Sequence, residues 1–184
     1  MCASELLSKV LGCILTEEEA SYALRKASGV ILGYAMEYRA VRVLDQMGFT
    51  NIIIADLPTH DIEAEKDGAR YFIEVKSTRH SLTREYSAHK IAMMAELDGI
   101  HATLAMLPEP KLHETEKILS EPKRMLFKIL RYIKLGDREK IDQMLSDHKV
   151  ARVIAGYKSL VIQYAESKSV KLELGEPIRV ETSI

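Results

Sequence analysis

Hydrophobic and polar positions alternate along residues 60–78, and this pattern predicts a β-hairpin. The turn signal is Asp67-Gly68, which stands between two alternating runs and is typical of a two-residue turn between antiparallel strands. Because successive side chains of a strand point to opposite faces, Glu74 and Lys76 are expected on one face. The other face is expected to carry Ile73, Val75 and Ser77. Asp61, on the paired strand, is expected to lie close to that face.

Helical periodicity precedes this hairpin. Apolar residues recur at three- and four-residue steps over residues 4–15, and Thr16 with Glu19 forms a capping-box pattern for a second helix over residues 16–27. A third helix is expected over residues 30–47, ending at a glycine. Glu37 shares the apolar side of this third helix, so it is expected to point inward, where a carboxylate needs a partner or a metal.

The segments that flank the hairpin predict the sheet topology. A short β-branched run over residues 51–55 indicates a strand before it, and residues 84–98 and 101–107 indicate a helix and a strand after it. A strand, a helix and a strand in this order favour a right-handed parallel crossover beside the antiparallel hairpin. The predicted fold class is therefore α/β, with a mixed central sheet flanked by helices.

The remaining residues predict an elaboration of helices and short strands after this core. One or two helices are expected over residues 111–135 and another over residues 137–148. Short strands are expected at 151–155, 160–165, 170–174 and 178–181. The predicted organisation is an N-terminal helical segment (1–29), a core (30–107) and a helical and β extension (108–184).

Composition and charge narrow the class of protein. With 184 residues, of which 47% are hydrophobic, the chain is long enough for one domain with a small annex. Its two cysteines lack metal-ligand spacing, and neither a signal peptide nor a membrane-length apolar run is evident, so we expect a soluble, cytoplasmic protein with no membrane partner. The net charge of −1 excludes a uniformly basic nucleic-acid binder but leaves room for a local basic surface.

Two carboxylates and an ammonium on one face of a hairpin have a defined chemical capability. Carboxylate oxygens are ligands for hard divalent cations, and a cation held in this way can activate a neighbouring water. The Glu74-Val75-Lys76 triplet alone carries little weight, because charged residues alternate on any solvated strand. Its context carries more weight, because the apolar residues around Glu74 predict a largely buried strand, in which a charge must be paired or metal-bound.

Glu37 on a helix after Gly33-Tyr34, Asp61 on a strand, and Glu74-Val75-Lys76 after a hairpin, followed by an α/β crossover, resemble the PD-(D/E)XK nuclease superfamily. The resemblance covers about residues 30–107 and is nearest to archaeal Holliday-junction resolvases and to Mrr-like or NO VEIN-type nuclease domains. The sequence departs from the Pro-Asp motif that gives the family its name at one position, where His60 rather than proline precedes Asp61. The fold that this resemblance implies is a restriction-endonuclease-like core.

The resemblance also implies an activity and roles for individual residues. The expected activity is a Mg²⁺-dependent or Mn²⁺-dependent endonuclease that hydrolyses phosphodiester bonds of DNA through a metal-activated water. Asp61, Glu74 and the Val75 carbonyl would bind the metal, and Glu37 would act through a bound water or help to seat a second ion. Lys76 would hold or help to deprotonate the water and stabilise developing charge. A salt bridge from Glu37 to Lys76 or to an arginine is the alternative role for that carboxylate.

Basic residues outside the hairpin are candidates for contacts with the DNA backbone. They lie just after the hairpin and on the predicted helix that follows residue 120, namely Arg79, Arg84, Lys90, Arg124, Lys128 and Arg131. The alternative is that the lysines and arginines of that helix only solvate its surface.

Other classes of protein stay open. A catalytically inactive nuclease-fold module for DNA binding or assembly would keep the same core, and a small-molecule metalloenzyme would need an apolar pocket. No nucleotide-binding loop is present, so no nucleotide cofactor is expected. A homodimer is expected because one metal site cuts one strand, and residues 126–133 and 160–165 are apolar enough for either core or a symmetric interface.

Overall fold

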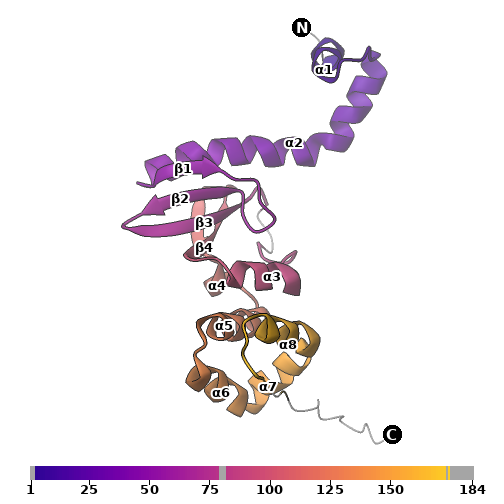
Figure 1. Ribbon diagram of the computed structural model, residues 1–184. Helices are drawn as coiled ribbons and strands as arrows, with labels where there is room; N and C mark the ends of the chain where they lie inside the picture. The colour runs from indigo at the N-terminus through magenta and orange to yellow at the C-terminus, as the bar shows by residue number, and fades with distance from the viewer. Residues whose placement is uncertain (1–2, 79–81, 173, 175–184) are drawn as a thin grey trace, which may run out of the picture.

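The computed structural model describes residues 3–78, 82–172 and 174. Its centre is a five-stranded mixed sheet with helices on both faces (Figure 1), so the α/β prediction is confirmed. The strands lie in the order of the chain: β1 (Thr50–Ile54), β2 (Ile62–Lys66), β3 (Ala69–Lys76), β4 (Ile100–Ala105) and β5 (Lys111–Glu114). Within the described residues, no helix combines the length and apolarity needed to cross a membrane.

The predicted hairpin forms the middle of the sheet. β2 and β3 pair antiparallel, and both turn residues have positive φ, 51° at Asp67 and 76° at Gly68, as a type I′ turn requires. β3 and β4 are parallel and are joined through α3 (Ala88–Ala95), so the parallel pairing and the connecting helix are confirmed. α3 is shorter than the predicted helix over residues 84–98, because Ser87 caps its start by accepting a hydrogen bond from the Lys90 amide at 3.1 Å.

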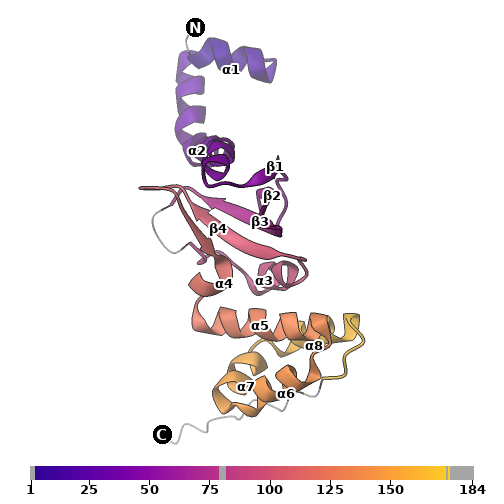
Figure 2. The same cartoon turned by 90° about the vertical axis from the view of Figure 1, so that its left-hand side faces the viewer.

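The N-terminal half of the chain holds one long helix where two were predicted. After α1 (Ala3–Leu11), α2 runs from Glu17 to Gln46 without interruption, although the capping box at Thr16 forms as expected. Gly29, at the predicted break, lies inside this helix, because a single glycine weakens a helix without ending it. α2 is bent, and its first part carries α1 away from the sheet (Figures 1 and 2).

Two separate hydrophobic cores hold the molecule together. One lies between the second part of α2 and the sheet, where Met36, Ala40 and Leu44 pack on residues such as Ile73 and Leu104. The other lies beyond α3, where α5 (Glu121–Leu135) packs against α3, α7 (His148–Ala155) and α8 (Lys158–Ser167). Leu126, Ile129, Leu130 and Ile133 are fully buried in this second core. These four residues are therefore core rather than an interface surface.

The C-terminal extension is helical, and most of the strands predicted there are wrong. Residues 151–155 lie in α7 and residues 160–165 in α8, while the described part of residues 170–174 has no regular structure. Short apolar runs do not distinguish a strand from a buried helix, and packing on α5 decides for the helix here. The strand predicted at residues 178–181 lies outside the described residues.

The segment between β4 and α7 begins with a strand that was not predicted, and the rest of it is helical as expected. Residues 111–114 form β5 at the edge of the sheet, followed by the short α4 (Thr115–Ile118), where only helix was predicted. α5 begins at Glu121 with Pro122 in its first turn and ends at Gly136, whose φ of 65° closes the helix. The helix predicted after it is confirmed as α6 (Arg138–Ser146).

Candidate functional site

The hairpin register brings two of the predicted carboxylates together. Ile62 pairs with Ile73 at the end of the hairpin that lies away from its turn. Asp61, just before β2, donates its backbone N–H to the Ile73 carbonyl at 3.0 Å, which places it beside the residue that precedes Glu74. The charge of Glu74 acts on the Asp61 carboxyl group, so the two predicted carboxylates lie near each other.

Asp61 is held in place by its own side chain. The backbone N–H of Val75 donates to Asp61 Oδ2 at 2.6 Å, where a regular ladder would use a backbone carbonyl. The carbonyl of Asp61 instead accepts from the amides of Ala55 and Asp56, at 2.8 and 3.2 Å. β2 thus leaves the ladder at this residue, and the carboxylate is fixed against β3.

Glu74 is buried between two ammonium groups. Its side chain is only 7% exposed, and its Oε1 lies 2.8 Å from Lys76 Nζ while its Oε2 lies 2.7 Å from Lys90 Nζ. Lys76 also approaches the exposed Glu85 at 3.5 Å, and Lys90 lies over the ring of Tyr86, with Nζ 4.9 Å from the ring centroid. Charged groups are stable at such depth only when they are paired, and here both oxygens of Glu74 have a partner.

The carboxylates at this end of the sheet repel one another. Burial raises the pKa of Asp61 above its usual value, against the hydrogen bond from Val75, and the charge of Glu74 raises it further. Burial likewise raises the pKa of Glu37, with added repulsion from Asp61, Asp56 and Glu74. A cation placed among these oxygens would relieve that repulsion.

Lys76 behaves in the opposite way to a simply buried lysine. Burial alone would lower the pKa of Lys76, but the contacts with Glu74 and Glu85 outweigh it and raise that pKa above its usual value. Lys76 is therefore an ammonium at neutral pH in this arrangement.

Glu37 comes to the site from α2, as predicted from its position on the apolar side of that helix. It is half-buried, and the described residues contain no salt bridge to it, so the predicted alternative of a partner in Lys76 or an arginine is not found there. Asp56, which the sequence did not single out, is a second acidic neighbour of Glu37. Its position depends on the backbone bonds between residues 55–56 and Asp61, which no local sequence signal indicates.

A preformed cage for a metal ion is not present. Across residues 3–78, 82–172 and 174, no three or more histidine, cysteine, aspartate or glutamate side chains are grouped so that they could hold an ion. Mg²⁺ does not require such a cage, because one or two carboxylates with several waters are enough. Asp61 and Glu74 fit that smaller requirement, provided that an ion displaces an ammonium from Glu74.

A chain of buried hydroxyl groups lies behind Glu74 on the same face of the sheet. His101 lies 2.8 Å from the Thr59 carbonyl through Nε2 and 2.7 Å from the Thr115 hydroxyl through Nδ1. Since a carbonyl only accepts, Nε2 must donate and Nδ1 must accept, so Thr115 accepts from Thr103 at 2.8 Å and Thr103 from Tyr86 at 3.0 Å. With the donors oriented from Tyr86 towards His101, every hydroxyl and ring nitrogen in this chain has a hydrogen-bond partner. Burial lowers the pKa of His101 to about 4, so its ring is neutral at pH 7.

The predicted DNA-contacting residues differ in what they contact. Lys90 binds Glu74, Arg131 donates to the Leu97 carbonyl at 2.7 Å, and Lys128 lies 3.6 Å from Glu116. Arg84 is exposed and precedes Glu85, the second partner of Lys76, and Arg124 is half-buried on α5. Arg79 lies outside the described residues.

The neighbouring basic residues of α5 are anchors for the segment around α3. Lys123 donates to the carbonyls of Thr83 and Arg84 at 2.8 and 3.1 Å, and Lys134 bonds Asp98 at 2.6 Å. Part of the basic face of α5 is thus used inside the molecule.

No protein-family model, no curated protein and no solved structure matches this chain.

Proposed function

We propose that this protein is a metal-dependent nuclease that hydrolyses phosphodiester bonds of DNA. The observation that carries the proposal is the fixed pair of Asp61 and Glu74 at the end of the hairpin, with Lys76 bonded to Glu74 on the same face. A buried carboxylate and a half-buried one that repel each other, beside an ammonium, are costly for a purely structural role and are suited to a cation.

The arrangement of elements gives separate support. A helix that carries Glu37 covers one face of the sheet, the hairpin supplies Asp61, Glu74 and Lys76, and α3 leads to a parallel strand. This order is what the resemblance to the PD-(D/E)XK superfamily implies for a restriction-endonuclease-like core. We therefore extend that resemblance, as a proposal, to the residue roles.

Mg²⁺ or Mn²⁺ would be held by Asp61, Glu74 and the Val75 carbonyl, with Glu37 acting through water. When bound, such an ion supplies positive charge at the phosphate and makes a nearby water more acidic. Lys76 donates hydrogen bonds and stabilises negative charge as it develops on the phosphate, a task for which a fixed ammonium needs no reorganisation. Its bond to Glu74 holds that ammonium at the end of β3.

DNA is the proposed substrate, and exposed basic residues are the proposed backbone contacts. Arg84 lies in the turn before α3, and Lys128 is exposed on α5. Lys90 would reach the phosphate only after it leaves Glu74. A single site of this kind cuts one strand, so two copies would be needed to cut both strands of a duplex.

One observation favours a second candidate, a catalytically inactive nuclease-fold module for DNA binding or assembly. Lys76 and Lys90 already neutralise Glu74 without any metal, and such a pair of salt bridges can serve as a structural lock. The two candidates differ in one property, because only the enzyme needs Asp61 and Glu74 to bind a divalent cation.

Titration calorimetry with Mn²⁺ tests the proposal on the wild type and on Asp61→Asn. We expect the wild type to bind Mn²⁺ and the variant to lose most of that binding, together with cleavage, while DNA binding stays largely intact. Glu85→Gln is the matched control, since it also converts a carboxylate near Lys76 to an amide but should leave Mn²⁺ binding unchanged. Equal Mn²⁺ affinity in wild type and Asp61→Asn would remove the metal site, and no Mn²⁺ binding by the wild type would favour the inactive module.

A further inference from the structure

Exposed apolar side chains are concentrated at one end of the molecule. Of the fifteen large hydrophobic side chains that are exposed in the described part of the chain, thirteen belong to residues 6–57. The other two are Met93 and Leu135. Scattered exposed hydrophobic residues are ordinary, but a concentration of this kind marks an interaction surface.

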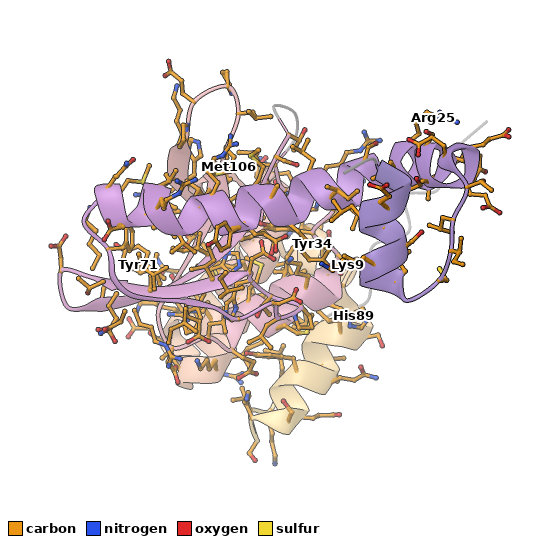
Figure 3. All side chains as sticks on the ribbon, turned by 90° about the horizontal axis from the view of Figure 1, so that it is seen from above. Lys9, Arg25, Tyr34, Tyr71, His89 and Met106 are labelled. Carbon is orange, nitrogen blue, oxygen red and sulfur yellow. The ribbon has the colours of Figure 1, made fainter. Side chains whose placement is uncertain are left out.

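These residues lie mainly on an arm, which we define as α1 and the part of α2 before Met36. The arm projects from the sheet at the end opposite to α5–α8 (Figures 1 and 2), and Figure 3 shows the part of α2 with Arg25 turning away from the straight part of that helix. Within α2 itself only Ala20, Met36, Ala40 and Leu44 are buried. Among the described side chains of the arm, Ala20 alone is buried, so most of the arm's apolar surface is left uncovered within one chain.

The exposed area is enough for a stable dimer. Tyr22, Tyr34 and Tyr38 are 58%, 59% and 72% exposed, and Val30, Ile31 and Leu32 between them are 62%, 47% and 42% exposed. Since a tyrosine can bury about 150–250 Å², the ten exposed apolar residues within residues 6–38 together offer on the order of 1,000 Å². A specific interface needs roughly 800 Å² from each partner.

The charges along α2 complement a second copy of the same helix. Its first turn carries Glu17 and Glu18, and its second part carries Arg39 and Arg42. The two arginines are exposed and form no salt bridge in the described part of the chain. The two groups lie in opposite halves of a 30-residue helix, too far apart to pair within one chain. In a two-fold pairing each contact occurs twice, so the acidic start of one α2 would face the arginines of the other.

A membrane surface fits these residues less well. Val30, Ile31 and Leu32 are consecutive and point in three directions around the helix, whereas a helix lying on a membrane buries one face. The acidic first turn would also be repelled by anionic lipid. A second arm can cover several sides of α2 at once.

We propose that the arm and the exposed face of α2 form a symmetric interface with a second copy of this chain. This inference does not depend on the nuclease proposal, since it concerns residues away from Asp61 and Glu74. It does place the dimer interface on the N-terminal helices, whereas the apolar residues of α5 fill the core.

Sedimentation velocity over a range of concentrations up to tens of micromolar tests the proposal on the full chain. We expect a wild-type dimer, and at least a tenfold increase in the dimer dissociation constant for Tyr22→Glu/Tyr38→Glu. Met93→Glu/Leu135→Glu is the matched control, because it places the same two charges on exposed apolar residues outside the arm. It should leave the dimer unchanged, and circular dichroism should show the helix content of every variant unchanged.

Charge reversal tests the two-fold pairing. Arg39→Glu/Arg42→Glu should weaken the dimer, and adding Glu17→Arg/Glu18→Arg to the same chain should restore it, since both contacts are then reversed. A monomeric wild type at tens of micromolar would overturn the proposal, whether or not that monomer binds vesicles or another protein. A dimer insensitive to the tyrosine variant, or not restored by the second reversal, would overturn it as well.

Discussion

At the scale of single residues, Glu74 is the centre of the proposed site because its environment sets what a metal ion must displace. Its two oxygens bond Lys76 and Lys90, which approach from the same strand and from α3. The strand alternation predicted that Glu74 and Lys76 share a face. The contact with Lys90 depends on how α3 packs over the sheet, so the sequence could indicate only that Lys90 is basic and close in the chain.

Lys90→Met should increase the affinity for Mn²⁺. Because the change frees Glu74 Oε2 from a competing cation, we expect about a tenfold lower dissociation constant, which corresponds to about 1.4 kcal/mol. Titration calorimetry measures this directly. Lys128→Met removes a lysine whose partner is Glu116, away from Glu74, and should leave the affinity as it is. Weaker Mn²⁺ binding in Lys90→Met would mean that Lys90 supports the metal site instead of competing with it.

His101 should make the fold sensitive to acid. Burial lowers its pKa from 6.5 to about 4, so the folded state stays neutral while the unfolded state takes up a proton. Above pH 6.5 the histidine is neutral in both states and does not change the free energy of unfolding. As the pH falls from 6.5 to 4, proton uptake by the unfolded state lowers the free energy of unfolding by about 3 kcal/mol.

Urea unfolding at several pH values between 7 and 4 measures that loss. His101→Gln cannot titrate, so its free energy of unfolding should fall less steeply over this window than that of the wild type. Carboxylates titrate in both proteins and cancel in the difference. Parallel pH curves for the two proteins would show that His101 is not held neutral by its buried hydroxyl chain.

At the scale of elements, the sequence predicted the structures that depend on local backbone conformation, such as the hairpin. Asp67-Gly68 specified the hairpin because both residues adopt positive φ, and period-two alternation placed the carboxylates. Packing decided the rest. α7 and α8 are helices because α5 offers them an apolar surface, and their short apolar sequences alone could form either structure.

Gly99, just before β4, shows a packing requirement that the sequence does not reveal. A Cβ at this position would lie 2.4 Å from the Arg70 carbonyl oxygen and 2.9 Å from the Phe72 ring. We expect Gly99→Ala to lower the free energy of unfolding by about 1–3 kcal/mol or more, because the obstructing atom is backbone. Gly33→Ala, where nothing lies within 4 Å of the new atom, should raise it by about 0.5–1 kcal/mol.

Chemical denaturation of both glycine variants checks this pair. The prediction fails if the two changes have the same sign. It would also fail if Gly99→Ala proved neutral, since β3 and β4 would then be able to move apart without cost.

At the scale of the whole molecule, three groups of helices surround or extend the sheet. The second part of α2 covers one face of the sheet and brings Glu37, α3 covers the other face and brings Lys90, and α5–α8 form a helical unit behind α3. The carboxylates lie at the end of the sheet where β2 leaves the ladder. The arm stands apart from these groups, and most of the exposed large hydrophobic side chains of the described residues lie on or near it.

Cleavage of DNA at this site is the property that defines the proposed nuclease, and the cleavage rate measures it directly. End-labelled linear, branched and single-stranded DNA should be incubated with Mg²⁺ or Mn²⁺ and with the wild type or Lys76→Met. We predict metal-dependent cleavage of at least one substrate by the wild type, and a rate lower by roughly 10²-fold or more for Lys76→Met with metal binding retained. A wild type that binds Mn²⁺ but cuts none of these DNAs, or an unchanged rate in Lys76→Met, would contradict it.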